Sequence, residues 1–324
     1  LIGGMRLGGG CRKPGTCSAS TATICTVDGN CPLGETCVGV ETCNGGTTDC
    51  VHTPLIDTNT SKGIGYSSYF ALDITNKDLN LNQNKPKLLW EFDGTWTDKK
   101  NYLGYATSGP AVVRINTLTS AGELDADGKK LNGKWYVVFG SGPTGPNDLV
   151  NYSFLGRSDQ NLRLFIFDLA EGPGINNANV KMIDTEIPNA FAGNMTSGTF
   201  DVDRNYADDV VYVPYIYKNA SDGEFTNGGI GRLVTRESTD LTKWKFTVVM
   251  DNTGPISTGT AKLKRTSGSG KRSVWLYFGA GRFFYHIGNN ADDSKNDVDF
   301  PLAPQKELMR QLFGMKDPCV DATE

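Results

Sequence analysis

The stretch that decides the fold is Thr196-Ser-Gly-Thr-Phe-Asp-Val-Asp-Arg-Asn-Tyr-Ala-Asp-Asp-Val-Val-Tyr-Val-Pro-Tyr-Ile-Tyr217. It contains a turn of small residues, a short strand, an acidic loop and a longer strand rich in valine and tyrosine. β-Branched and aromatic residues favour strands over helices. We therefore expect two antiparallel strands joined by the acidic loop.

The same unit recurs along the chain, with strands expected at 107–115, 134–143, 162–169 and 180–184 before this stretch and at 231–236, 244–250, 257–264 and 273–282 after it. Strands are also expected near 66–75 and 85–93. Four-stranded antiparallel units that repeat along a chain are typical of β-propeller blades. The sequence thus predicts an all-β fold, a partial ring of four-stranded antiparallel propeller blades.

The ring is incomplete in this chain. Residues 1–104 lack a first strand, and residues 256–290 show mainly the opening strands of a unit. A closed propeller typically has about four to eight blades. Exposed sheet edges must be paired or covered, so upstream sequence, another chain or strands shared between copies would complete the ring. The edge argument favours a partner segment.

Four regions follow from this organisation. Residues 1–10 form the first propeller strand, 11–62 a cysteine-rich insert, 63–300 the blades, and 301–324 a short C-terminal helix and tail. The helix is predicted because Leu308, Met309, Leu312 and Phe313 share one helical face, with Gly314 as its C-cap.

Eight cysteines indicate disulfides: Cys11, Cys17, Cys25, Cys31, Cys37, Cys43, Cys50 and Cys319. Their spacing contains no Cys-x-x-Cys, which argues against zinc clusters and c-type haem. Disulfides persist in oxidising places, so we expect an extracellular protein. Because seven cysteines lie in the insert, either Cys319 pairs back to it or two thiols stay free. The spacing leaves the connectivity open.

The overall charge and hydropathy exclude several classes of partner. A net charge of −4 argues against nucleic acid or anionic lipid as the main partner. The chain contains no apolar run of the roughly 18 residues that a membrane helix needs. It begins at Leu1 without a signal peptide, and we expect it to be a processed or excised part of a longer protein.

The acidic loop has the spacing of a calcium-binding loop. Asp201, Asp203, Asn205 and Asp209 stand at positions one, three, five and nine, and Ala207 would offer its carbonyl. Ca²⁺ prefers such oxygen ligands. The loop departs from the usual pattern at Tyr206, where glycine is favoured for the turn, and it has Tyr212 instead of a glutamate at position twelve. The alternative interpretation is a solvated acidic turn.

Five stretches together resemble one family: Leu1–Met5, Tyr69–Thr75, Val138–Gly142, Asp201–Asp209 and Tyr277–Arg282. They are similar, in sequence and in order, to the C-terminal β-propeller of PilY-type (PilC/PilY) proteins, which are adhesins and biogenesis factors at the tip of type IV pili. The resemblance covers most of residues 63–290 and the first ten residues. The cysteine-rich insert is not a general feature of that family.

The resemblance implies an extracellular or cell-surface protein, at the pilus tip or outer-membrane surface, that acts in pilus assembly and surface adhesion. It implies a Ca²⁺ loop tied to pilus extension and retraction, with Asp201, Asp203, Asn205, the Ala207 carbonyl and Asp209 as ligands. The implied partners are an upstream fragment of the same precursor, other pilus-tip subunits and minor pilins.

An enzyme is not expected. The only histidines are His52 and His286, and neither lies in a metalloprotease motif or beside a nucleophile elbow. Two alternatives stay open. One is a structural interaction or filament-forming module that self-associates or is completed by another chain through sheet edges. The other is a propeller hydrolase or a quinone-dependent enzyme.

Overall fold

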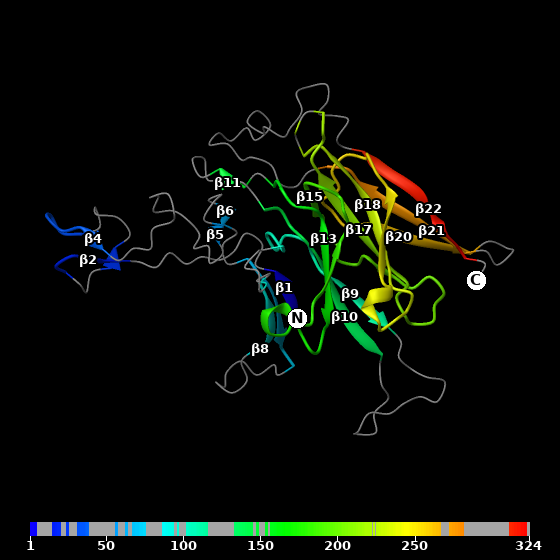
Figure 1. Cartoon of the computed structure of the whole chain (residues 1–324), viewed down its shortest axis with the longest axis horizontal. Helices are drawn as coiled ribbons and strands as arrows, with labels where there is room; N and C mark the ends of the chain where they lie inside the picture. Colours follow the sequence, from blue (N-terminus) through cyan, green and yellow to red (C-terminus); the bar gives the residue numbers. More distant parts are fainter. Residues whose placement is uncertain are drawn as a thin grey trace, which may run out of the picture.

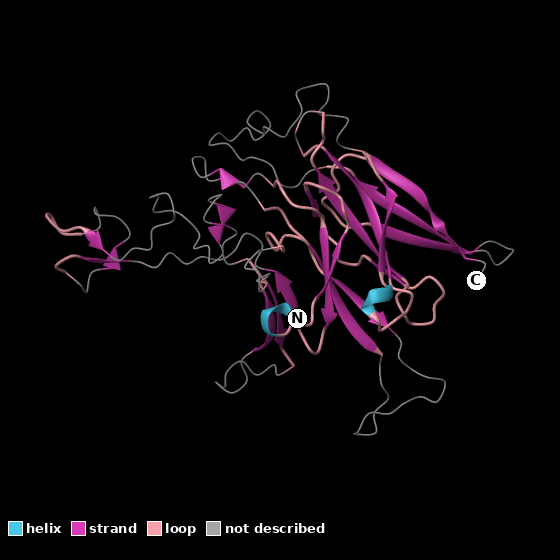
Figure 2. Ribbon diagram, viewed as in Figure 1, coloured by secondary structure: helices cyan, strands magenta, loops and turns pink. Residues whose placement is uncertain are grey.

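The computed structural model describes residues 1–4, 15–20, 24–25, 31–38, 56–57, 62–63, 67–75, 86–93, 96, 102–115, 133–144, 147–148, 153–154, 156–221, 223, 225–266, 272–281 and 311–322. These segments form β-strands, turns and two short 3-10 helices, η2 (Ile175–Asn177) and η3 (Leu241–Lys243) (Figure 2). None of their helices is long and apolar enough to span a membrane. The all-β prediction is confirmed.

Four antiparallel sheets form the body of the fold (Figure 1). The first sheet has the order β1 (Ile2–Gly4), β7 (Tyr69–Asp73), β8 (Lys87–Phe92). The second has the order β14 (Lys181–Asp184), β13 (Arg163–Asp168), β10 (Lys134–Gly140), β9 (Ala111–Ile115). The third has the order β15 (Ala190–Ala192), β17 (Val210–Tyr217), β18 (Asn227–Val234), β19 (Lys245–Met250), and β16 (Thr199–Phe200) also pairs with β17. The fourth has the order β20 (Ala261–Thr266), β21 (Arg272–Gly279), β22 (Leu312–Ala322).

Shorter strands make three small sheets apart from these four. They are β3 (Ile24–Cys25), β2 (Gly15–Cys17) and β4 (Cys37–Val38) in the insert, β5 (Ile56–Asp57) with β6 (Lys62–Gly63), and β11 (Asn147–Asp148) with β12 (Ser153–Phe154).

A separate apolar cluster joins each of the four main sheets to the next. The cluster between the first and second sheets is rich in aromatic side chains: Tyr69 and Phe92 of the first sheet pack against Phe139 of the second. Val138 of the second sheet and Val211 of the third belong to the next cluster. Tyr212 and Ile230 of the third sheet pack with Leu276 of the fourth, among others. The sheets therefore pack face to face in chain order.

The predicted strands are confirmed in all four sheets, but the described sheets do not close into a ring. The first and fourth sheets lie at opposite ends of the stack (Figure 1). What the structure has is therefore a series of small antiparallel sheets, each of which packs on its neighbour.

The helix predicted over the C-terminal region is wrong for residues 312–314. These residues begin β22, which pairs with β21 through Phe313 opposite Phe278 and Gly314 opposite Tyr277. Phe313 and Met315 pack on the core between the third and fourth sheets, so the burial alternates every second residue, as in a strand. Gly314 is therefore a strand residue and not a helix cap. The absence of a side chain there leaves room for the Tyr277 ring, because a Cβ at this position would come within 3.0 Å of it. Leu308 and Met309 lie outside the described residues.

The cysteine-rich insert contains the predicted disulfides in its described part. Cys17 and Cys31 are joined, with their Cα atoms 5.5 Å apart, and Cys37 is disulfide-bonded. Only the backbone is described at Cys25, and Cys11, Cys43 and Cys50 lie outside the described residues. Cys319 is an exposed free thiol in the structure, so the disulfide suggested for it is not formed here and its pairing stays a prediction.

A buried ion pair anchors β22 to the third sheet. Arg232 of β18 donates from Nη1 to Oδ1 and Oδ2 of Asp317 at 2.6 and 2.8 Å. The Tyr212 hydroxyl of β17 donates to Asp317 Oδ2 at 2.8 Å. The Asp317 side chain is 0% exposed and that of Arg232 is 7% exposed. The last strand therefore carries an acid whose partners all have to be in place when the two sheets pack.

We expect Asp317→Ala to lower the free energy of unfolding by about 3–5 kcal/mol, because it leaves the Arg232 guanidinium buried without a counter-ion. Urea unfolding at neutral pH measures the change. The matched control is Glu171→Ala, which removes one partner of the exposed Lys134–Glu171 pair at 3.8 Å and should cost less than about 1 kcal/mol. Equal costs for the two variants would contradict the anchoring role of Asp317.

Candidate metal centre

The acidic loop closes on itself because its two ends pair. β16 and β17 are antiparallel neighbours, with Phe200 opposite Val210. The Asp209 amide donates to the Phe200 carbonyl at 3.0 Å, which brings the last residue of the loop back to the residue before its first. Residues 201–209 thus form a compact loop at one end of the third sheet, as the sequence predicted.

Three of the predicted ligands converge inside this loop. Asp201, Asp203 and Asp209 each offer a carboxylate oxygen, and these oxygens lie within 4.8 Å of one another. Backbone N–H groups of the loop orient the acids. Asp201 accepts from Arg204 at 2.5 Å and from Tyr206 at 2.9 Å, and Asp209 accepts from Val202 at 2.5 Å.

The tyrosine at the sixth position adopts the conformation for which such loops favour glycine. Tyr206 has φ 72° and Arg204 has φ 69°, both in the left-handed region. A residue with a side chain pays about 1 kcal/mol or more for this conformation. The Tyr206 side chain leaves the loop: it is 72% exposed, with the Arg114 guanidinium 6.0 Å from its ring centroid. Tyrosine in place of glycine at position 206 therefore strains the backbone of the turn, but the loop keeps its closed conformation.

Asn205 and Ala207 support the loop from its middle. The Asn205 side-chain oxygen accepts from the Ala207 amide at 2.8 Å. Its amide nitrogen donates to Asp203 at 3.1 Å and to Glu237 at 2.8 Å. Asn205 would have to turn its side-chain amide to offer its oxygen to a cation. Ala207 is fully buried, as a residue that serves through its backbone would be.

Glu237 is a fourth carboxylate at this site, and the sequence analysis missed it. It lies in the turn after β18, which reaches the loop because Val234 pairs with Val210. Thr235 connects the two segments: its amide and hydroxyl donate to the Asp209 carbonyl at 2.9 Å and the Asp208 carbonyl at 2.6 Å. The Glu237 amide in turn donates to Thr235 Oγ1 at 3.0 Å. Only the pairing of β17 with β18 could have pointed to this residue.

Asp209 and Glu237 lie side by side in this cluster, and the charge of Glu237 disfavours the ionised form of Asp209. Burial is the main cause that raises the pKa of Asp209 to about 6. The nearby charges of Glu237 and Asp203 and a hydrogen bond with Glu237 contribute to this rise, and the hydrogen bond from the Val202 amide opposes it. A proton between the two carboxylates relieves their repulsion. A divalent cation would relieve the same repulsion without protonation, because it binds the ionised form.

Asp208 lies in the loop but points to a different place. Its carboxylate accepts from the Arg114 amide, and its own amide donates to the Arg114 carbonyl, both at 2.8 Å. Burial raises the pKa of Asp208, and the Arg114 amide opposes that rise. Asp208 thus joins the loop to β9 of the second sheet and is not part of the carboxylate cluster.

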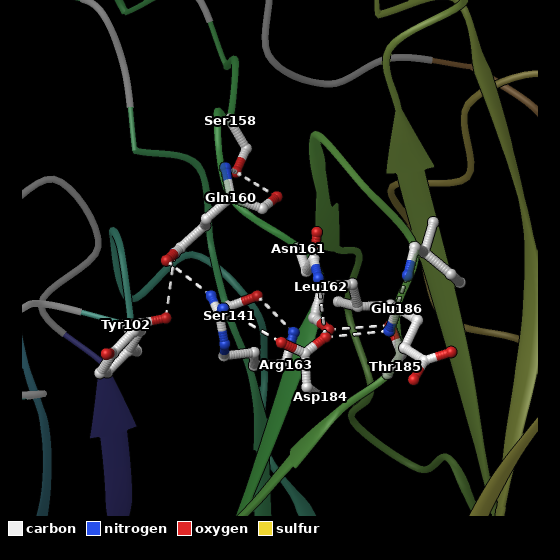
Figure 3. A network of polar contacts seen from close by, with 11 residues as sticks. Tyr102, Ser141, Ser158, Gln160, Asn161, Leu162, Arg163, Asp184, Thr185 and Glu186 are labelled. Carbon is white, nitrogen blue, oxygen red and sulfur yellow. Dashed lines mark hydrogen bonds and ion pairs between the residues drawn. The ribbon is translucent and has the colours of Figure 1, made fainter.

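A second polar cluster lies at the end of the second sheet (Figure 3). Arg163 forms an ion pair with Asp184 at 3.1 Å, donates to Gln160 at 3.1 Å and stacks over Tyr102 at 4.7 Å. Gln160 donates to the Tyr102 carbonyl at 3.0 Å, and the Arg163 amide donates to Ser141 Oγ at 2.9 Å. These groups satisfy one another and hold the segment before β13 in place.

The donor set of the acidic loop suits a hard cation. Carboxylate, amide and backbone oxygens are the ligands that Ca²⁺ and Mg²⁺ take, whereas zinc and copper sites are built mainly on histidine nitrogen and cysteine sulfur. The two histidines, His52 and His286, lie outside the described residues. Comparisons of the chain with models of protein families, with curated proteins and with solved structures found no match.

In a chelator, we expect the free energy of unfolding to fall as the pH rises from 3.8 through about 6. The folded chain holds a proton on Asp209 in this window, whereas the unfolded chain has released it. Urea unfolding at several pH values measures the free energy of unfolding of the wild type and of Asp209→Asn. The difference between the two variants isolates the contribution of Asp209. Glu237→Gln should flatten the difference because it removes a neighbouring charge. A difference that grows in the opposite direction would contradict the raised pKa of Asp209.

Proposed function

We propose that the chain is a calcium-binding, extracellular sheet module in which Ca²⁺ binds in the 201–209 loop. The observation that carries the proposal is the convergence of the Asp201, Asp203 and Asp209 carboxylates within 4.8 Å of one another. Asn205 and the Ala207 carbonyl complete the ligand set that the spacing predicts. Glu237 adds a further carboxylate beside Asp209. Ca²⁺ takes about six to eight oxygens, so a loop with this supply suits it.

The bound ion would act as a clamp between two turns. Asp201, Asp203 and Asp209 come from the loop between β16 and β17, and Glu237 comes from the turn after β18. Above a pH of about 6 Asp209 is ionised, and its charge then adds to the repulsion within this cluster. A cation that binds only the folded arrangement adds its binding free energy to the stability of the fold.

The prediction is that Ca²⁺ raises the melting temperature of the wild type by several degrees. An ion at about a hundred times its dissociation constant adds about 2.7 kcal/mol. Asp203→Ala should abolish the shift, and Glu237→Gln should reduce it. Glu171→Gln, which changes an exposed acid in the turn after β13, should leave it unchanged. Differential scanning calorimetry measures the shifts, and the absence of any calcium-dependent heat or shift in the wild type would refute the site.

We propose further that this module is a partial β-propeller of a type IV pilus tip protein, with roles in pilus assembly and surface adhesion. Support comes from the order of the five stretches that resemble the PilY-type family, and from the chain of small antiparallel sheets that pack in sequence order. The disulfides of the insert agree with an extracellular protein. The proposed partners are other pilus-tip subunits, minor pilins and an upstream fragment of the same precursor.

The pilus role predicts where the protein lies on the cell. Gold-labelled antibody against this chain should mark pilus tips in electron micrographs of the source cells, and deletion of the gene should reduce the number of surface pili. Cells that express an Asp203→Ala chain should show altered piliation if the ion serves pilus extension. Label spread over the cell body, with normal piliation in the deletion strain, would contradict this role.

Within the described residues, no observation favours a hydrolase or a quinone-dependent enzyme, and we propose neither.

A further inference from the structure

The two end sheets of the stack each have one face that none of the other three main sheets covers, among the residues that the structure describes. Inside the stack, each sheet is covered on both sides by its neighbours through the apolar clusters. In the part of the chain that the structure describes, the apolar clusters join the first sheet to the second and the fourth sheet to the third. The first and fourth sheets lie at opposite ends of the series of four sheets (Figure 1), so they do not pack on each other within the chain.

The outer face of the fourth sheet is apolar. Leu263 of β20 pairs with Trp275 of β21, and Tyr277 pairs with Gly314 of β22. Directly paired residues lie on the same side of a sheet. Their neighbours in sequence, Leu276 and Phe278, point into the core, so this set points outward. Leu263 is 55% exposed and Tyr277 is 41% exposed.

The outer face of the first sheet is built in the same way. Phe70 of β7 pairs with Gly3 of β1, and Leu72 pairs with Leu88 of β8. Tyr69 and Ala71, which alternate with them, belong to the core. Leu88 is 54% exposed. On each of the two faces an aromatic ring lies over a glycine: a Cβ at Gly3 would come within 2.8 Å of the Phe70 ring, and one at Gly314 within 3.0 Å of the Tyr277 ring.

Among the residues whose side chains the structure describes, the charges beside the two apolar patches are opposite. Glu91 stands next to Phe70 on the outer face of the first sheet, and it is exposed. Lys316 stands next to Trp275 on the outer face of the fourth sheet, and Arg265 lies on the same face; both are exposed. Neither face is therefore complementary to itself, but each is complementary to the other. A twofold contact between identical faces would bring like charges together, and this costs free energy.

We propose that the outer face of the first sheet packs on the outer face of the fourth sheet of a second copy of this chain. Two copies related by a twofold axis make this contact twice and leave neither end uncovered, which closes the assembly. The closed assembly has eight sheets in a ring, within the range of about four to eight blades that propellers use. This contact joins faces, whereas β-augmentation would join edges. It does not depend on calcium binding.

The test is the mass of the full chain in solution, by size-exclusion chromatography with light scattering over a range of concentrations. The expected mass is twice the chain mass of 35.0 kDa. Tyr277→Lys and Leu263→Lys should each give a monomer. The control is Val248→Lys, which places the same charge at a site that is 50% exposed on β19 of the third sheet and should keep the dimer. Circular dichroism of each variant checks that it is folded.

A charge exchange separates this contact from other ways to dimerise. Glu91→Lys and Lys316→Glu should each raise the dissociation constant of the dimer by about tenfold, because each contact occurs twice and turns from attraction to repulsion. The double variant should restore the dissociation constant of the wild type. A wild type that is monomeric at every concentration, a ladder of larger assemblies, or a dimer that ignores these substitutions would overturn the proposal.

Discussion

The constraint on which the structure depends is that a small sheet with two apolar faces is stable only when both faces are covered. Phe139 and Phe167 of the second sheet pack toward the first sheet, while Val138 and Ile166 of the same strands pack toward the third. Burial of one such side chain contributes about 1.5–3 kcal/mol. No sheet can contribute this alone, so stability comes from the joints between sheets, and the ends of the series are its weakest points.

The third sheet holds the polar features that depend on those joints. On one side, Asp208 connects its acidic loop to β9 of the second sheet through two backbone contacts of Arg114. On the other side, Arg232 and Tyr212 bind Asp317 of the fourth sheet. The carboxylate cluster lies between these contacts, where β17 begins and β18 ends. Its acids are therefore held by a scaffold that neighbouring sheets fix, and they cannot separate to relieve their repulsion without a loss of packing.

Most strands of the four sheets could be predicted, because their valine, tyrosine and phenylalanine runs are long and turns of small residues separate them. The C-terminal strand could not. Leu308, Met309, Leu312 and Phe313 have helical spacing, whereas the alternation that decides for a strand begins only with Phe313, Met315 and Asp317. Its partner β21 is also distant in sequence. For the same reason Glu237 was missed: its position beside Asp209 follows from strand pairing, and no local motif records it.

The loop spacing identified Asp201, Asp203 and Asp209 because local geometry fixes them, yet Tyr206 shows why spacing alone does not give affinity. A glycine would enter the left-handed conformation at φ 72° without strain, whereas tyrosine in this conformation destabilises the folded state with or without an ion. This cost lowers the stability of the loop but is the same before and after binding, so it does not weaken binding to a loop that is already closed. If the loop opens without the ion, the backbone strain at Tyr206 arises only on binding and lowers the affinity. The backbone hydrogen bonds to Asp201 and Asp209 argue for the closed loop.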